Sequence, residues 1–329
     1  MGSFYEYKGK KMAVIGNGCS AAQVVPTVKK EAASVTQYAR SAQWYHERPN
    51  SYFTRLEKMA FKYLPLWERW KRLQLFLEND ELVTTYMPGV GAARKRERVE
   101  THAKEYIFSR TPEKYHNFIV LTSRSVLPPL VLYHAHDSRE TGCKRRIFDP
   151  SYLDALNAPN VEVIPEGIRE ITETGIISSS GRQEDIDVIV VATGFQVQQF
   201  LTPMEIIGKE GKSLNQQWKE HRGAQAYMGS YVHNFPNLAI LFGPNTFPAH
   251  NSALFAIEVQ ISYVARTMLA PLIDRRFSTF EVSLTAENQW VNSIHQQLSG
   301  SVFDAGCSNW YINEYGRNAA SWPGYASMF

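Results

Sequence analysis

The sequence predicts an α/β protein built on a Rossmann-like parallel sheet, and three observations lead to this prediction. An apolar run at residues 12–15 enters a glycine turn at residues 16–21. A helical segment at residues 20–30 follows, and a second short strand is expected at Ser34–Tyr38. This order of strand, turn, helix and strand is a βαβ unit. A β-branched run at residues 186–191 ends in another glycine turn, which is typical of a buried parallel strand.

Composition indicates an ordinary globular protein. With 329 residues, of which 44% are hydrophobic and 20% charged, the chain can form one large or two modest domains. The net charge of +3 does not indicate nucleic acid or an anionic membrane as a partner. No secretion signal is recognised and apolar runs such as residues 188–192 are too short to span a bilayer. We therefore expect a cytoplasmic protein without membrane contact.

Cysteine usage agrees with a reducing compartment. The three cysteines, Cys19, Cys143 and Cys307, are widely separated and form no CxxC pair. A disulfide framework or a cysteine-based zinc site is therefore not expected, and no metal is assigned.

Residues 51–136 are expected to form an inserted helical subdomain. Large apolar residues recur there at the spacing of one helix face, as in Leu64, Trp67, Trp70, Leu73 and Phe76. This face is expected to pack on the sheet; alternatively, its aromatic side chains also cover a substrate pocket. Residues 1–50 and 137–197 then make up the dinucleotide-binding domain.

The remaining residues, 198–329, are expected to form a C-terminal part that carries the substrate pocket. Residues 238–242 read as a strand, and residues 252–272 and 286–298 as helices. The tail, residues 307–329, is rich in Trp, Tyr, Gly and Asn and reads as an ordered irregular wrap.

The glycine turn is a GxGxxA fingerprint between a strand and a helix. Gly16 allows the tight turn, and Gly18 lets a pyrophosphate approach the backbone. Ala21 keeps the helix close to the strand, and the N–H groups of the first helical turn, around Ser20, bind phosphate.

The end of the second strand favours NADP(H) over NAD(H). An NAD site carries Asp or Glu there, whereas this chain has Arg40 and Ser41. A guanidinium group pairs with a 2′-phosphate. The alternative is a site that has lost its ligand and keeps only its shape.

Ordered sequence blocks from residue 8 to the C-terminus resemble the Baeyer–Villiger and related class B flavin monooxygenases, in the version common in fungal natural-product pathways. The blocks are residues 9–18, 40–41, 44–45, 48–50, 142–149, 187–195, 235–237, 243–246, 307, 310–311, 316–318 and 322–324.

The resemblance implies roles for individual residues. Gly16, Gly18 and Arg40 are similar to the family's NADP contacts, and Lys144 to its second 2′-phosphate contact. Arg145 matches the arginine that stabilises the negatively charged flavin peroxide. Further family positions are the hinge at residues 192–194, which contains Thr193 and Gly194, and Asn245 and residues 250–252 near flavin and substrate.

The chain also departs from the family pattern. The family's FAD fold precedes the NADP unit by well over a hundred residues, whereas seven residues precede Lys8 here. Residues 121–141 are inserted before the Arg145 block, and residues 247–252 differ from the usual form. We therefore expect an N-terminally truncated family member that does not bind FAD alone, with residues 198–329 a remnant of the FAD domain.

Three functional hypotheses follow. The first is a flavin-independent, redox-neutral cyclase or isomerase, such as a [4+2] pericyclase, acting on a hydrophobic polycyclic or terpenoid-like molecule. The second is an FAD- and NADPH-dependent monooxygenase represented by a fragment, and the third is a non-catalytic NADP- or partner-binding remnant. A homodimer is expected.

The candidate catalytic residues are Arg145, Lys144, His250 and Tyr227. Asn245, Asn251 and Trp310 are expected in the substrate pocket, and Ser20, Ser41, Thr193 and Gly194 at the cofactor.

Each candidate also has a structural interpretation. Arg145 could form a salt bridge, His250 a structural hydrogen bond, and Trp310 part of the core of the C-terminal wrap.

Overall fold

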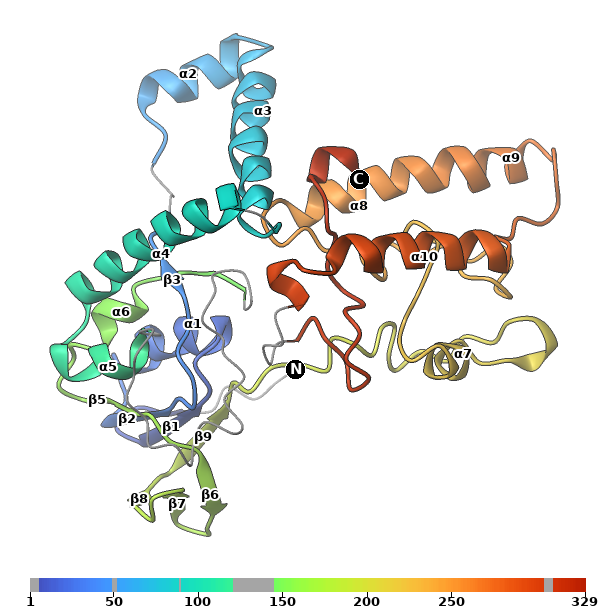
Figure 1. Ribbon diagram of the computed structural model, residues 1–329. Coiled ribbons are helices and arrows are strands. Elements are labelled where there is room, and N and C mark those ends of the chain that lie inside the picture. The colour runs from blue at the N-terminus through green and yellow to red at the C-terminus, as the bar shows by residue number, and fades with distance from the viewer. Residues whose placement is uncertain (1–5, 49–51, 89, 121–144, 305–309) are drawn as a thin grey trace. The chain divides into compact units, whose positions relative to one another are not determined.

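The computed structural model describes residues 6–48, 52–88, 90–120, 145–304 and 310–329 (Figure 1). The chain divides into two compact units. We call Met1–Asn50 with Glu97–Phe195 the sheet unit, and Ser51–Arg96 with Gln196–Phe329 the helical unit. This differs from the expected three-part division, because the predicted helical insertion is split between the two units.

The sheet unit contains the predicted parallel sheet. Its four strands lie in the order β5-β2-β1-β9, and each neighbouring pair is parallel. The predicted α/β class with a Rossmann-like sheet is confirmed. The elements are β1 (Lys11–Ile15), α1 (Cys19–Val28), β2 (Ser34–Tyr38), β5 (Val161–Ile164) and β9 (Val188–Val191).

Small and branched apolar side chains hold α1 on this sheet. Ala21 and Val25 of α1 are fully buried against Val14 of β1 and Val35 of β2. Since alanine has the smallest side chain that still favours a helix, Ala21 lets α1 approach the sheet closely. This close packing fixes the position of the glycine turn between β1 and α1.

The strand β9 is less buried than the sequence predicts. Among the described strands it lies at one edge of the sheet with β1 as its neighbour, and its valines are half-buried up to Val191, which is 70% exposed. An edge strand has only one hydrogen-bonded neighbour, so a continuous apolar run does not guarantee burial.

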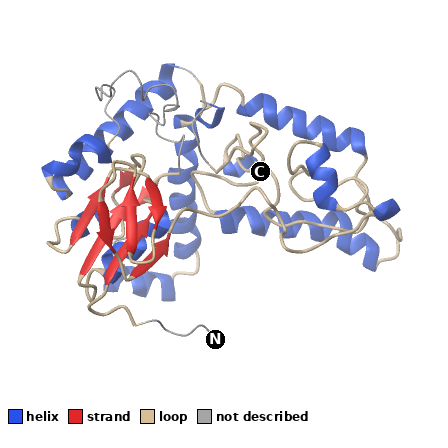
Figure 2. Cartoon of the chain, turned by 90° about the horizontal axis from the view of Figure 1, so that it is seen from below, coloured by secondary structure: helices blue, strands red, loops and turns tan. Residues whose placement is uncertain are grey.

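The other strands of the described residues also lie in the sheet unit, as Figure 2 shows. A parallel pair joins β3 to β4, and an antiparallel sheet has the order β6-β7-β8. The bounds of these and the remaining elements are β3 (Tyr45–His46), β4 (Ile147–Phe148), β6 (Ile168–Ile171), β7 (Gly175–Ser178), β8 (Gln183–Asp185), η2 (Glu113–Tyr115), α5 (His116–Ile119) and α6 (Tyr152–Ala155); α4 (Val90–Arg110) contributes to both units.

The helical unit contains helices and irregular segments. The helix predicted at residues 252–272 is present as one continuous helix, Ala253–Ile273. It is the one helix of the described chain that is long and apolar enough to cross a bilayer, and 22% of its most apolar window is buried. The elements are α2 (Arg55–Tyr63), α3 (Trp67–Asp80), η1 (Glu81–Thr85), η3 (Lys209–Gly211), α7 (Leu214–Glu220), α8 (Ala253–Val264), η4 (Ala265–Leu269), α9 (Ala270–Ile273), α10 (Leu284–Leu298), η5 (Val302–Asp304) and η6 (Ala326–Met328).

Two sequence predictions are wrong in this unit. Residues 238–242 form no strand: Ile240 N donates to Ser230 O and Phe242 N to the side chain of Gln260, so no neighbouring strand pairs with them. In addition, the apolar face expected to pack on the sheet is largely exposed, including Trp70 and Leu73. Periodicity identifies an apolar helix face but not what covers it.

Candidate functional site

The glycine turn after β1 requires glycine at its first position. Gly16 has φ +116°, and a Cβ atom there would lie 2.3 Å from the carbonyl oxygen of Ala192. Its N–H donates to the Tyr38 carbonyl over 2.9 Å. The turn is therefore enclosed by the ends of β2 and β9, as the βαβ prediction requires.

The second glycine opens the turn on its other side. Gly18 is the N-cap of α1, and no atom lies within 4 Å of the place where its Cβ would be. No side chain caps α1, and its first turn, which contains Ser20, has no acidic residue. A helix N-terminus with this open space above it fits a pyrophosphate group, which the backbone N–H groups would hold.

A buried polar network that the sequence does not predict lies beneath the turn. Gln37, which is fully buried on β2, donates from Nε2 to the Gly16 carbonyl over 2.8 Å. Its Oε1 accepts from the Tyr152 hydroxyl over 2.8 Å. The Tyr45 hydroxyl donates to the Asn17 carbonyl over 2.9 Å, and its ring stacks on that of Tyr152. We call Gln37, Tyr45 and Tyr152 the turn-support network.

This network is neutral. Burial raises the pKa of the Tyr45 hydroxyl well above its ordinary value, and burial also raises that of Tyr152. Both hydroxyls therefore stay protonated and remain donors. Two carbonyls of the turn are thus bound from below, which leaves the opposite side of the turn for a ligand.

Arg40 lies just after β2, where the sequence predicts the 2′-phosphate contact. Its side chain is exposed, and it forms no ion pair with an acidic side chain of the described residues. The carbonyl of the adjacent Ser41 accepts a hydrogen bond from the Asn17 side chain, which connects this segment to the glycine turn. A guanidinium next to such a turn fits a 2′-phosphate.

The remaining candidates of the sheet unit lie at its surface. Thr193 and Gly194 follow β9 and are exposed, and the Thr193 nitrogen lies 3.5 Å from the Cβ position of Gly16. Arg145 is also exposed, while Lys144 lies outside the described residues. The predicted cofactor residues Gly16, Gly18, Ser20, Arg40, Ser41, Thr193 and Gly194 are therefore all brought to the turn or to the adjoining strand ends.

The helical unit does not gather its candidates into one site. His250 is buried, and its Nε2 lies 3.1 Å from Oδ1 of Asp80, whose side chain is also buried. Asp80 further accepts from Ala326 N and from both N and Oγ of Ser327. We call these residues the Asp80 hub. Asp80 thus joins the end of α3 to His250 and to the C-terminal segment, an arrangement that supports the structural interpretation of His250.

Hydrogen bonds affect the pKa of the Asp80 carboxyl group more strongly in total than burial does. Burial by itself would raise the pKa of Asp80, but bonds from Ser327, Ala326 and His250 together lower it below its ordinary value. A carboxylate that accepts several N–H and O–H groups is held in its charged form.

Asn245, Trp310 and Tyr227 have separate surroundings. The side chain of buried Asn245 donates to the carbonyls of Asn318 and Ser321. Trp310 packs against Phe247 and Tyr311, and the Tyr227 ring lies 5.9 Å from that of Trp290. Among the described residues, no group of His, Cys, Asp and Glu side chains could hold a metal ion.

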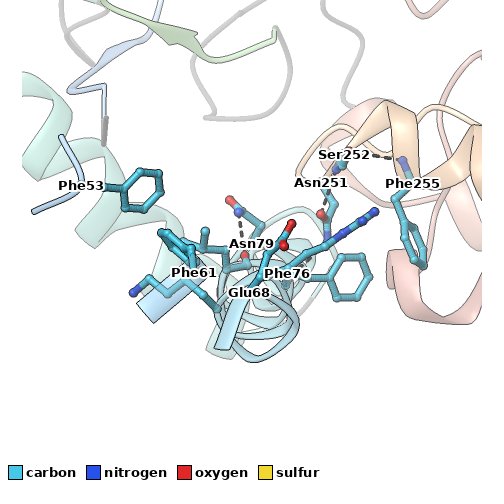
Figure 3. Close-up of a pocket in the computed structure, with 11 residues that line it drawn as sticks. Phe53, Phe61, Glu68, Phe76, Asn79, Asn251, Ser252 and Phe255 are labelled. Atoms are coloured by element: carbon cyan, nitrogen blue, oxygen red, sulfur yellow. Dashed lines mark hydrogen bonds between the residues drawn. The ribbon is translucent and has the colours of Figure 1, made fainter. Parts of the chain in front are cut away.

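Asn251 borders a hollow, which Figure 3 shows between the α2–α3 pair and the start of α8. Its volume is about 680 Å³, and its walls are mostly apolar. Asn251 donates to the Phe76 carbonyl over 3.2 Å. The lining residues labelled in Figure 3 are Phe53, Phe61, Glu68, Phe76, Asn79, Asn251, Ser252 and Phe255.

Known proteins with similar sequences are flavin monooxygenases. A Baeyer–Villiger monooxygenase of Pseudomonas aeruginosa is 33% identical over 99% of this chain and 58% of its own length. The FAD-binding monooxygenase ktnD of Aspergillus niger is 32% identical over 97% of this chain and 50% of its own length. The chain therefore spans about half the length of these relatives. No family model matches it.

Solved structures show the same fold. The complex of OTEMO with FAD and NADP superposes with a TM-score of 0.74 at 20% identity, over 98% of this chain and 64% of that one. An oxidised steroid monooxygenase bound to NADP gives a TM-score of 0.74 at 22% identity over the same shares. The resemblance predicted from the sequence blocks is confirmed: the chain is, over nearly its whole length, a homologue of the Baeyer–Villiger and FAD-binding monooxygenases.

Proposed function

We propose that this chain binds NADPH and provides the nicotinamide-nucleotide site of a Baeyer–Villiger-type flavin monooxygenase. The observation that carries the proposal is the glycine turn, with the open N-terminus of α1 on one side and Arg40 beside it. The named relatives and the NADP-bound structural neighbours support the same assignment.

The residues of the turn have distinct parts in this proposal. Gly18 leaves room for the pyrophosphate, and the N–H groups at the start of α1 bind it. Arg40 pairs with the 2′-phosphate and so selects NADPH over NADH. Bound NADPH supplies a hydride; the protein supplies binding and orientation.

A flavin site is not assigned to any described residue. Within the ranges that the structure describes, β1 is the one strand that runs through a glycine turn directly into a helix. The expectation that FAD does not bind the chain alone stays a prediction, as does the redox-neutral cyclase, for which the mostly apolar hollow offers space.

Titration with NADPH and NADH tests the proposal. We expect NADPH to quench tryptophan fluorescence with an affinity at least about 10-fold higher than that of NADH, because a charge-assisted pair contributes about 1.5–3 kcal/mol. Arg40→Gln should abolish this preference. Arg169→Gln, which changes another exposed arginine of the sheet unit, is the matched control and should preserve it.

Two results would contradict the proposal: no binding at millimolar NADPH, or equal affinities of the wild-type chain for NADPH and NADH. Adding FAD to the same samples separates the functional hypotheses. Flavin reduction by NADPH would support the monooxygenase, whereas product formation without either nucleotide would support the cyclase.

A further inference from the structure

We infer that the α2–α3 arm, residues 52–80 of the helical unit, docks on the surface of an anionic lipid bilayer. The inference starts from the turn between the two helices, Tyr63-Leu-Pro-Leu-Trp67, which contains five successive residues without a charge. All five are exposed; Leu64 is 54% and Leu66 70% accessible. Surface turns are normally polar, so an apolar turn at this position indicates a surface that meets apolar material.

The apolar surface continues along α3. Leu66, Trp70, Leu73 and Leu77 recur at spacings of four, three and four, which places them on one face of the helix. Their exposed fractions lie between 47% and 70%. A stripe of this kind, ending in an apolar turn, is the pattern of a helix that lies in a membrane interface.

A different side of α3 attaches the arm to the rest of the helical unit. Arg72 forms an ion pair with Glu258 over 2.8 Å, and the Phe76 ring lies 4.5 Å from that of Phe255. Arg72 lies near the middle of α3 and Phe76 in its C-terminal half, and the turn is at the far end of the helix from α8 (Figure 1).

The arm forms from local signals rather than from burial of its stripe. A capping box between Thr54 and Glu57 starts α2, and Trp67 N donates to the Leu64 carbonyl across the turn. No residue of α2 is buried, and in α3 only Asp80 is. The apolar residues are thus free to meet a partner without unfolding the helices.

The net charge of the arm favours an anionic bilayer over a second copy of the chain as its partner. Residues 52–80 contain six Lys or Arg side chains and four acidic ones, of which Asp80 is buried, so the arm has a net charge of +2. Two copies of such a surface would repel one another, whereas an anionic bilayer attracts it. Lys62 lies over the Tyr63 ring at 5.1 Å, which leaves its charged end beside the turn. Exposed Trp and Tyr are also the side chains that prefer a lipid–water interface. The sequence-based expectation of no membrane contact rests on the small net charge of the whole chain and on the absence of bilayer-spanning apolar runs. Docking of the arm on a membrane surface requires neither feature.

Co-sedimentation with vesicles tests the inference. We expect the purified chain to bind phosphatidylcholine vesicles that contain about one-third phosphatidylserine, and to bind pure phosphatidylcholine at least about 10-fold more weakly. Leu64→Ser with Leu66→Ser should lower the partition coefficient about 10-fold or more. Lys62→Gln with Arg69→Gln should lower the partition coefficient roughly 25-fold, and added salt should also lower it.

The matched control is Leu254→Ser with Ile273→Ser, two side chains of the same unit that are 71% and 78% exposed. This variant should bind vesicles as the wild type does. Fluorescence quenching by brominated lipid gives an independent readout, which should decrease in Trp70→Phe and not in Trp290→Phe. Unchanged circular dichroism and NADPH affinity verify that the variants are folded.

Three outcomes would overturn the inference. These are no binding to anionic vesicles, an equal loss of binding in the Leu254/Ile273 control, and a dimer that the Leu64/Leu66 variant dissociates without any vesicle binding. The last result would assign the arm to a second copy of the chain.

Discussion

The two units each contain a buried polar network, and the two networks differ in charge and in what they hold. In the sheet unit, the turn-support network is neutral and binds the carbonyls of Gly16 and Asn17. In the helical unit, the Asp80 hub is centred on a carboxylate that joins the end of α3 to His250 and to Ala326 and Ser327. The first positions a loop, whereas the second connects distant segments of the chain.

This difference separates ligand affinity from stability. Removing a buried carboxylate that accepts from five donors takes away the acceptor that these donors share. Removing the neutral Gln37 amide leaves fewer groups without a hydrogen-bond partner. However, this amide positions the glycine turn, which is the segment proposed to bind the cofactor. Variants of the hub should therefore act mainly on unfolding, and variants of the turn-support network on NADPH affinity as well.

The largest effect is expected from Asp80→Ala. It removes the acceptor for His250, Ala326 and Ser327 and should destabilise the helical unit by about 3–5 kcal/mol in urea unfolding. Asp274→Ala, which breaks an exposed pair with Arg276, is the control and should change stability by less than about 0.5 kcal/mol. If both variants unfold at the same urea concentration, the hub does not hold the unit together.

Acid should weaken both units through buried neutral histidines. Burial, with Arg146 and His102 nearby, lowers the pKa of His46 to about 3; burial and Arg317 lower that of His295 to about 4. Between pH 6.5 and 4 the unfolded chain takes up these protons and the folded chain does not, so stability falls as the pH falls. The slope should reach about 1.4 kcal/mol per pH unit for each histidine.

His295→Gln tests this slope in the helical unit. It removes one titrating group, so the pH dependence of the unfolding free energy should become shallower between pH 6.5 and 4. Equal slopes in the variant and the wild type would show that His295 is protonated in the folded chain.

Gln37→Leu should act on stability and on affinity together. It leaves the Gly16 carbonyl and the Tyr152 hydroxyl without their buried partner, which costs about 1–3 kcal/mol, and should weaken NADPH binding about 10-fold. Affinity for 2′-AMP, which has no pyrophosphate, should stay within about twofold. Tyr115→Phe, a change in the same core that removes the acceptor for Val163 N, is the control. Equal losses for NADPH and 2′-AMP would indicate general damage instead of a displaced turn.

The smallest effect is expected from Tyr45→Phe. The ring and its stacking on Tyr152 are kept, and only the hydroxyl bond to the Asn17 carbonyl is lost. We expect a loss of about 1 kcal/mol in stability and a several-fold weaker binding of NADPH. An unchanged NADPH dissociation constant would remove Tyr45 from the turn-support network.

The sequence predicts local features of this fold better than long-range ones. The strand at Ser34–Tyr38 has the predicted bounds because its signal, a short strand-forming segment directly after a glycine turn and a helix, is local. Residues 238–242 carry a similar signal, but a strand also needs a neighbour to pair with, and the sequence does not show whether one is present.

The candidate site shows the same limit. Gly16 and Arg40 are recognisable because the fingerprint spaces them along one βαβ unit. The turn-support network joins Gln37 to Tyr152, 115 residues apart, so spacing gives no indication of it. One signal was present: Gln37 has a long polar side chain within a short strand that the sequence predicts to lie inside the sheet, and such a side chain needs a buried partner.

Hydrogen exchange with and without NADPH tests directly whether the turn after β1 is the nucleotide site. Saturating NADPH should slow amide exchange in the peptides covering residues 12–22 and 38–42 of the sheet unit, and should leave exchange in the Asp80 hub unchanged. Unchanged exchange in residues 12–22 at saturation, or protection confined to the helical unit, would contradict this site assignment.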